Sequence, residues 1–282
     1  MEVTSLIITT IHEMDSIPAL KQAGADAILI GIKGLSVCSA NTVEIEALKD
    51  WKEICLANQM ELYVNACKLM MDSDFDRCKD LIQTCKDLSI DGIYFSDEGL
   101  LYIAKEMGYT RLVYQPETLI ANHRDVEFYL NQGCLAVSLA HELSLAEIQQ
   151  ISVAGGCEVL IDGYFSILYS RRPLITNYLD AIDRPDFKKR SHLDLIEQTR
   201  LDRMPIVEDE TGTHIFSEQP IQSIQEIASL ESFGIKRFRI DSFLKDDAWT
   251  IQVLNAYRQG TPIDGSNHWY YQNTTLKKED TV

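Results

Sequence analysis

Short apolar runs alternate with longer amphipathic segments along most of the chain. The apolar runs are rich in β-branched residues and nearly continuous, as expected of strands buried on both faces of a parallel sheet. Eight strands are predicted, at Ser5–Thr9, Ala27–Gly31, Glu61–Asn65, Gly92–Phe95, Leu112–Tyr114, Leu135–Leu139, Glu158–Ile161 and Arg237–Ile240. The segments between them place apolar residues three or four positions apart, which predicts helices that cover the strands.

Repeated strand–helix units imply a parallel sheet with right-handed crossovers. Eight units in 282 residues favour a closed (βα)8 TIM-like barrel over an open doubly wound sheet. The chain also lacks the G-x-G-x-x-G turn of a dinucleotide site. We therefore expect one barrel domain over residues 1–260. We expect the polar tail, residues 261–282, to pack briefly through Trp269, Tyr270 and Tyr271 and then fray.

One connection is much longer than the others, at residues 164–219 after the seventh strand. Loops of this length are uncommon unless they are functional or have structure of their own. Met204–Val207 and Thr213–Phe216 flank a glycine-containing turn, which predicts a β-hairpin within this insertion.

Polar residues follow the predicted strands, where the catalytic groups of a parallel barrel collect. Glu117 and Glu142 are candidates for a carboxylate pair in hydrolysis, and His141 is a candidate general base. No metal site is expected, because His141 begins H-E-L-S-L, which lacks the second histidine of a zinc hydrolase motif. A G-x-S-x-G nucleophile turn is absent as well.

A local basic stretch suggests anion binding. The whole chain has a net charge of −17, which argues against nucleic-acid binding by its surface at large. Residues 168–203, in contrast, hold eight basic and six acidic side chains. Paired guanidinium groups suit carboxylate or phosphate recognition, although salt bridges to nearby acids would explain them equally well. The candidate binding residues are Asn122, Asp162, Arg171, Arg172, Lys188, Lys189 and Arg190.

The seven cysteines include no C-x-x-C pair and lie among apolar residues, which predicts free buried thiols in a reducing compartment. The chain begins without a signal-peptide pattern and contains no apolar run long enough for a membrane span. We therefore expect a cytoplasmic protein that does not engage membranes.

Several segments together resemble peptidase family U32 over about residues 1–245. Ala23–Gly31, His141–Ile148, Pro205–Ser217 and Ile235–Asp241 are similar to stretches of that family. Glu158–Tyr178 resembles the family signature, with Asp162 in place of a histidine and with Ser166 and Pro173 in place of two cysteines. In related members four cysteines hold an iron–sulfur cluster. The resemblance therefore implies that this chain binds no cofactor of its own.

The replaced cysteines resemble those of a short, cluster-less branch found in Firmicutes. That resemblance implies a subunit of a system that hydroxylates the wobble uridine of tRNA to 5-hydroxyuridine. A longer, cluster-bearing U32 paralogue would be its partner, with tRNA and a small carboxylated metabolite as possible ligands. Two alternatives stay open: a peptidase or other hydrolase that uses strand-end carboxylates, and a non-catalytic partner of the paralogue.

Overall fold

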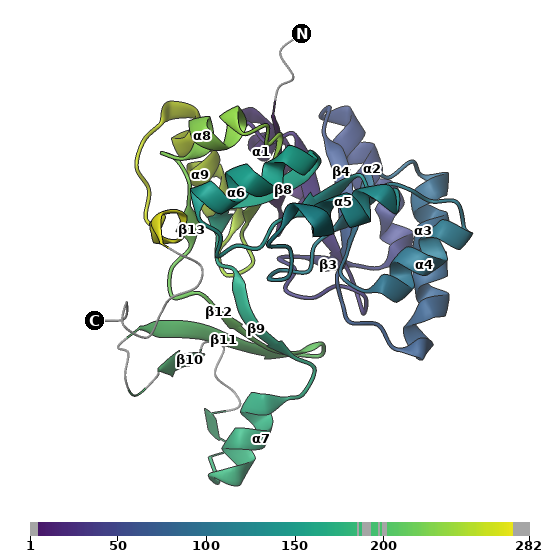
Figure 1. Cartoon of the computed structure of the whole chain (residues 1–282). Coiled ribbons are helices and arrows are strands. Elements are labelled where there is room, and N and C mark those ends of the chain that lie inside the picture. Colours follow the sequence, from purple (N-terminus) through teal and green to yellow (C-terminus); the bar gives the residue numbers. More distant parts are fainter. Residues whose placement is uncertain (1–4, 185, 188–192, 197, 199–201, 273–282) are drawn as a thin grey trace.

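A closed barrel of eight parallel strands forms the body of the protein (Figure 1). The computed structural model describes residues 5–184, 186–187, 193–196, 198 and 202–272. Strand β1 pairs with both β2 and β14, and these pairings close the barrel. Its strands are β1 (Leu6–Thr10), β2 (Ala27–Ile32), β4 (Glu61–Ala66), β5 (Gly92–Phe95), β6 (Leu112–Tyr114), β7 (Ala136–Ser138), β8 (Cys157–Gly163) and β14 (Arg237–Asp241). The predicted barrel is confirmed strand by strand.

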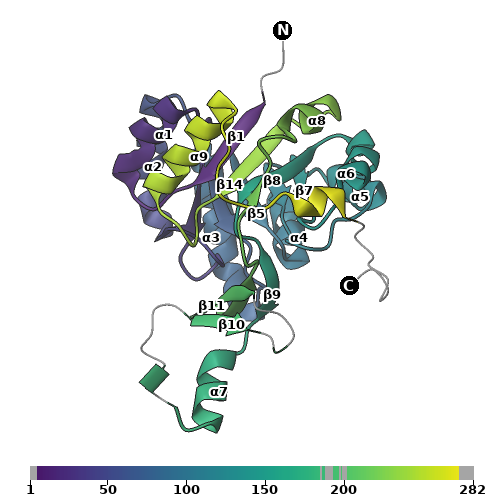
Figure 2. The same ribbon diagram turned by 90° about the vertical axis from the view of Figure 1, so that its left-hand side faces the viewer.

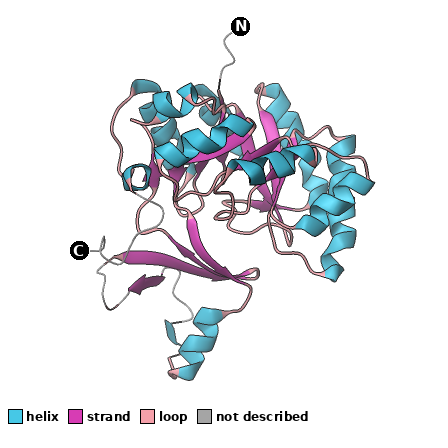
Figure 3. Ribbon diagram, in the orientation of Figure 1, coloured by secondary structure: helices cyan, strands magenta, loops and turns pink. Residues whose placement is uncertain are grey.

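Helices surround the barrel, as the amphipathic segments predicted (Figure 3). Those between and after the strands are α1 (Ile17–Ala23), α2 (Leu48–Ala57), α3 (Phe75–Asp87), α4 (Glu98–Glu106), α5 (His123–Asn131), α6 (Leu145–Ile151), α8 (Ile227–Ser232) and α9 (Asp247–Gln259). The two short strands β3 (Thr42–Val43) and β13 (Ile221–Gln222) extend the sheet beside β2 and β8. Helix α6 begins at a capping box in which Ser144 and Glu147 satisfy each other's backbone amides.

The barrel separates two apolar cores. The larger lies between the strands and the helices and takes in most of the buried apolar residues. The smaller lies inside the barrel and is built around Ile8, Leu29, Tyr63, Tyr94 and Val113. Charged side chains also enter the barrel interior, since Glu158 of β8 and Arg237 of β14 form hydrogen bonds with Tyr94 and Tyr63 of this inner core.

The insertion after β8 forms a small sheet and a helix that project from the barrel (Figures 1 and 2). Its strands are ordered β10 (Leu193–Ile196), β11 (Arg203–Asp209), β12 (Gly212–Phe216) and β9 (Ser166–Ser170), and α7 spans Leu174–Ala181. The predicted hairpin is confirmed as the antiparallel pair β11–β12. The structured elements β9, β10 and α7 were not predicted, because their exposed apolar residues follow neither a helical nor a strand period clearly.

The described part of the C-terminal tail packs against the barrel. Tyr270 is 3% exposed, and its hydroxyl pairs with the Ser223 hydroxyl at 2.6 Å. The fraying that we expected falls on residues 273–282, which lie outside the described residues. Among the helices that the structure describes, none has the length and apolar character needed to cross a membrane.

Candidate functional site

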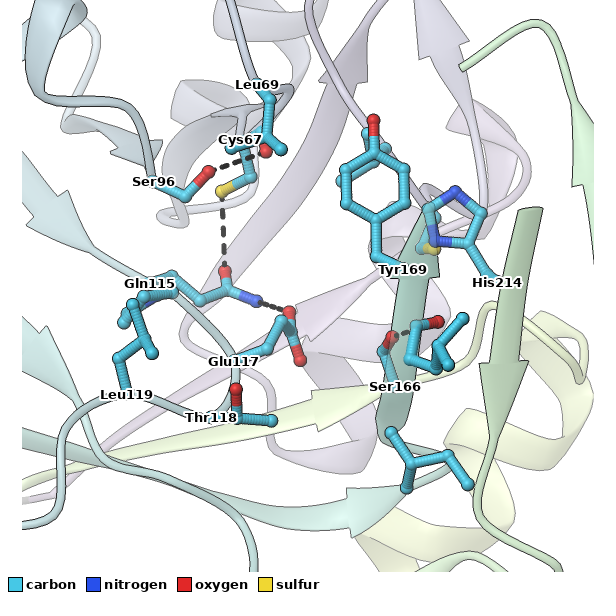
Figure 4. A pocket seen from close by; sticks show the side chains of 15 residues that line it. Cys67, Leu69, Ser96, Gln115, Glu117, Thr118, Leu119, Ser166, Tyr169 and His214 are labelled. Atoms are coloured by element: carbon cyan, nitrogen blue, oxygen red, sulfur yellow. Dashed lines mark hydrogen bonds between the residues drawn. The ribbon is translucent and has the colours of Figure 1, made fainter. Parts of the chain in front are cut away.

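Two joined cavities open at the carboxyl ends of the barrel strands. The inner cavity, about 20 Å³, is lined by polar groups that include Asn65, Arg239 and Asp241. The outer cavity, about 180 Å³, lies between the loop after β6 and strands β9 and β12 of the insertion (Figure 4). Residues common to both linings include Cys38, Cys67, Gln115, Glu117 and Ser166. Barrel and insertion together therefore form the site.

Arg239 forms the charged floor of the inner cavity. Its side chain is almost fully buried, and Nη1 donates to Asp241 Oδ2 at 2.8 Å. Its Nη2 lies 3.4 Å from His141 Nε2, and its Nε lies 3.7 Å from Glu158 Oε1. Arg237, Arg239 and Asp241 alternate along β14, so all three side chains point into the barrel. Because side chains alternate along a strand, β14 places three charged residues one after another along the barrel axis.

Below Arg239, a second layer anchors Glu158. The Glu158 carboxylate accepts a hydrogen bond from the Tyr94 hydroxyl at 2.5 Å and one from Arg237 Nε at 3.3 Å. Arg237 also donates to the Tyr63 hydroxyl at 3.3 Å. Glu158 is fully buried, and a buried charge of this kind is tolerated only when it is paired. Glu158, fixed in this way, lies 3.7 Å from Arg239 and so helps to position its guanidinium group beneath the cavity.

Close packing of β8 on β14 sets the position of Asp241. Gly163 ends β8 with φ +123°, and a Cβ at this position would lie 2.3 Å from the Asp241 carbonyl oxygen. Only glycine accommodates that approach at this backbone conformation. The Asp162–Gly163 pair of the signature therefore has a structural role at the barrel rim.

His141 is neutral and oriented by its neighbours. Burial, followed by the positive charge of Arg239, lowers the pKa of His141 to about 3. Because Arg239 can only donate, His141 Nε2 must accept, which places the ring proton on Nδ1. That nitrogen faces Glu117 Oε2 at 3.5 Å. His141 therefore links the buried guanidinium to the carboxylate at the cavity mouth.

Glu117 is held in an unusual backbone conformation at the mouth. Its φ is +64°, and Cys38 on the opposite loop has φ +48°. Left-handed conformations of non-glycine residues cost of order 1–3 kcal/mol and cluster at functional sites. Gln115 Nε2 donates to Glu117 Oε1 at 2.6 Å and so fixes the carboxylate from one side. The position of Glu117 is thus determined by its backbone and by the hydrogen bond from Gln115.

The thiols at the mouth are protonated at neutral pH. Burial, followed by the negative charge of Glu117, raises the pKa of the Cys38 thiol and that of the Cys67 thiol. A cysteine nucleophile acts as thiolate, so these two side chains are poorly suited to that role.

The insertion supplies the aromatic wall of the outer cavity. The rings of Tyr169 on β9 and His214 on β12 stack with centroids 4.6 Å apart and planes 8° from parallel. The Tyr169 hydroxyl donates to the Thr211 carbonyl at 3.0 Å, which fixes the ring against rotation out of the cavity. Leu119, on the opposite wall, is 65% exposed.

The sequence-predicted catalytic residues do not all converge. Glu117 and His141 face each other at the barrel mouth, as described above. Glu142 instead lines a separate groove of about 330 Å³, together with Phe165, Met204 and Trp269. Glu117 and Glu142 therefore lie on different cavities and do not form a pair around one substrate position.

The predicted anion-binding residues are spread over the molecule. Asn122 caps α5, where its side chain accepts from the Asp125 amide at 3.0 Å. Asp162 is fully buried behind the rim. Arg171 and Arg172 follow β9 and are exposed, one five-residue strand (roughly 17 Å) beyond the barrel. The remaining candidates Lys188, Lys189 and Arg190 lie outside the described residues.

The charged residues that organise the barrel interior were not predicted. Arg239 and Glu158 lie within predicted strands whose other residues are mostly apolar. The alternation Arg-Phe-Arg-Ile-Asp at residues 237–241 was an available signal, because it puts three charges on one face of a buried strand. Tyr169 and His214 gave no such signal, since their pairing depends on the unpredicted strand β9.

Fold and site define a (βα)8 barrel with a charged interior and a mouth completed by an inserted sheet. The chain matches the model of peptidase family U32 over residues 12–273 and belongs to this family. It is 28% identical to tRNA hydroxylation protein P2 of Bacillus subtilis (strain 168), a match that covers 100% of this chain and 92% of that protein. It is 22% identical to tRNA hydroxylation protein P1 of the same organism, over 84% of this chain but only 58% of the longer protein.

Among solved structures, the U32 peptidase Mk0906 has a similar fold. The TM-score is 0.52 at 11% sequence identity, and the match covers 86% of this chain and 94% of that chain. At this identity the likeness supports a common fold and carries no argument about activity.

Proposed function

We propose that this protein is a subunit of a tRNA-hydroxylating system and that it acts on the wobble uridine. The likeness to tRNA hydroxylation protein P2 carries the proposal, because it extends over the whole chain and nearly the whole relative. The barrel supports it as well, since its mouth is open, polar at the floor and apolar at the wall. In this role the chain binds and orients the RNA.

We further propose that the oxidative chemistry depends on a longer U32 paralogue, in line with the greater length of protein P1. Two cysteines, Cys38 and Cys67, line the cavities among the described residues. An iron–sulfur cluster takes four thiolates, and burial raises the pKa of both of these thiols. The side chains present therefore do not fit a cluster, and we assign no step of the reaction to one in this chain.

A peptidase role finds less support in this geometry. Peptide hydrolysis by two carboxylates needs both at one substrate position, and Glu117 and Glu142 line different cavities. Protonated thiols and a neutral His141 without an adjacent nucleophile offer no alternative. We therefore propose no hydrolytic step for this chain.

The test is to delete the gene and measure 5-hydroxyuridine in tRNA by mass spectrometry. We expect the modification to fall sharply and to return when the wild-type gene is restored. Glu117→Gln should restore it poorly, whereas Glu127→Gln, on the outer helix α5, should restore it fully. An unchanged level in the deletion strain, with no second hydroxylation pathway present, would contradict the proposal.

Co-purification with the longer paralogue tests the partnership separately. We expect tagged wild-type protein to retain the paralogue at close to equal amounts. A protein that supports hydroxylation without any association would remove the partner from the proposal and leave the barrel acting alone.

A further inference from the structure

We infer that the outer cavity binds a flipped-out pyrimidine base of RNA, which Tyr169 stacks on and Glu117 recognises. This inference rests on the proposed function and deepens it by assigning the base to one pocket. Single-stranded RNA is usually recognised by splaying a base onto an aromatic ring and hydrogen-bonding its edge. Enzymes that modify a base likewise take it out of the stack into a fitted pocket.

The two sides of the cavity match these two tasks. Figure 4 shows Gln115 and Glu117 on one side, with Ser166 and Tyr169 facing them across the open space. The Tyr169 ring is half-buried, backed by His214 and fixed through its hydroxyl. A nucleobase is a planar ring with polar groups along its edge. The Tyr169 ring offers a surface on which such a ring can stack, and Gln115 and Glu117 offer hydrogen-bonding groups for its edge.

The charge of the cavity selects a neutral ligand over an anion. No Lys or Arg is among the described residues that line the outer cavity, whereas the Glu117 carboxylate is among them. Deeper in, Arg239 is already paired with Asp241 and lies close to Glu158. A phosphate or a carboxylated metabolite in the outer cavity would therefore meet an acidic group without a cation, and we assign the cavity to the base.

Glu117 also distinguishes between pyrimidines. An ionised carboxylate only accepts hydrogen bonds. The N3–H of uracil donates to such a group, whereas the N3 lone pair of cytosine is repelled by it. Gln115 holds the carboxylate by a hydrogen bond and the His141 ring packs beside it, which limits its freedom to turn away from the wrong base. The geometry thus points to Glu117 as the residue that determines specificity for uracil.

The position of the phosphates follows from the insertion. Arg171 and Arg172 lie just beyond the end of β9, the strand that carries Tyr169. Both side chains are exposed, as phosphate-binding residues must be. A strand of RNA whose base enters the cavity can therefore place its backbone along the outer part of the insertion.

Photocrosslinking tests the location of the base. The full-length protein, together with its longer paralogue, is mixed with an anticodon stem-loop carrying 4-thiouridine at the wobble position and irradiated. We expect the crosslink in the peptide containing Tyr169 or in the segment 115–119. A crosslink in the groove beside Trp269, or no crosslink in either pocket segment, would overturn the inference.

Binding of stem-loops by variants tests the two roles. Tyr169→Ala should weaken binding about tenfold or more, as loss of a base stack does, while Tyr169→Phe keeps the ring, loses only the hydrogen bond to Thr211 and should lose clearly less. Tyr178→Ala is the matched control, because Tyr178 is an exposed tyrosine on α7 of the same insertion. Equal losses in Tyr169→Ala and Tyr178→Ala would contradict stacking.

Should Tyr169→Ala fail to fold, Glu117→Gln provides an independent readout. We expect this variant to bind stem-loops with uridine or cytidine at the wobble position equally, whereas wild type prefers uridine. A retained preference would overturn the role of Glu117. The deletion strain separates failure of this inference from failure of the proposed function. If the deletion strain loses 5-hydroxyuridine but the crosslinks fall outside the outer cavity, the base-binding pocket is rejected and the proposed function stands.

Discussion

At the scale of single residues, Asp162 combines deep burial with a lack of partners. The side chain is fully buried, and neither carboxyl oxygen has a hydrogen-bond partner among the described residues. The nearby Tyr257 hydroxyl donates to the Ile161 carbonyl at 2.6 Å. Burial raises the pKa of Asp162 from 3.8 to about 8, against the smaller opposing influences of the Tyr257 hydroxyl, the Gly163 amide and the Lys245 charge. Asp162 is therefore protonated in the folded protein at neutral pH.

Asp162→Asn should accordingly change how stability depends on pH. Between pH 3.8 and about 8 the folded state binds a proton that the unfolded state has released, so wild-type stability falls as pH rises. The slope from one group is at most about 1.4 kcal/mol per pH unit. The variant lacks this term, and its advantage should grow from pH 5 to pH 8 in urea unfolding. A pH-independent difference would contradict the raised pKa.

The sequence predicted those site residues that lie at the ends of strands. Glu117 and His141 were found because each follows a predicted strand, and parallel strands bring such positions together. The buried ionisable residues around them, Arg239 and Asp162, could not be placed from the sequence. Arg239 depends on which face of β14 points inward, and Asp162 points away from the cavities because β8 and β14 shift register near the rim. A register shift of this kind has no clear mark in the sequence.

At the scale of elements, β14 carries the charge network of the barrel interior. Arg239→Met removes the cation that Asp241 binds at 2.8 Å and that lies 3.7 Å from Glu158, while Glu158 keeps its pairing with Arg237. Breaking a buried pair in this way costs about 3–5 kcal/mol. Adding Glu158→Gln should recover part of that loss. Urea unfolding of the two single variants and the double variant measures the coupling. Arg258→Met, at an exposed position of α9, is the control and should cost under about 1 kcal/mol.

If the losses of Arg239→Met and Glu158→Gln were simply additive, the two side chains would not act as one network. Additivity is the usual result for distant, independent sites. The 3.7 Å separation of Arg239 and Glu158 makes coupling the expected result here.

The C-terminal segment is a structural element of the barrel as well. Tyr270 is buried against Ser223, whereas its neighbour Tyr271 is 66% exposed. Tyr270→Ala should cost about 3–5 kcal/mol, as removal of a buried aromatic ring does. Tyr271→Ala should cost under about 1 kcal/mol, although it loses a hydrogen bond to Glu226. Thermal unfolding compares the two variants, and equal effects would mean that the burial of Tyr270 against the barrel does not contribute to stability.

At the scale of the whole molecule, the barrel was predictable and the insertion only in part. Eight buried strands with helices between them leave few topologies open. The hairpin β11–β12 was marked by its glycine turn, but α7 is held by contacts that no local pattern reports. Glu208 on β11 accepts from the Ile175 amide at 2.8 Å, and Thr213 donates to the Arg172 carbonyl at 2.8 Å. These contacts join α7 to the inserted sheet.

Since α7 is anchored within the insertion, the outer part of the insertion should be removable. Ser170 pairs with Thr213 in the β9–β12 ladder. An Asn-Gly turn in place of residues 171–212 would close that pair as a two-residue hairpin. It keeps the Tyr169 and His214 side chains but removes Thr211, to which the Tyr169 hydroxyl donates. We expect the shortened protein to unfold within about 5 °C of wild type, because the barrel cores are untouched.

RNA binding by the shortened protein should be weaker and less dependent on salt. Loss of Arg171 and Arg172 alone removes two phosphate contacts, which lowers the slope of log affinity against log salt by about 1.4 for single strands. Arg171→Gln with Arg172→Gln in the full-length protein is the control and should reproduce that change without altering the fold. Fluorescence anisotropy at several salt concentrations measures both. An unchanged slope in both proteins would mean that the RNA backbone takes another path and that the insertion serves the base alone.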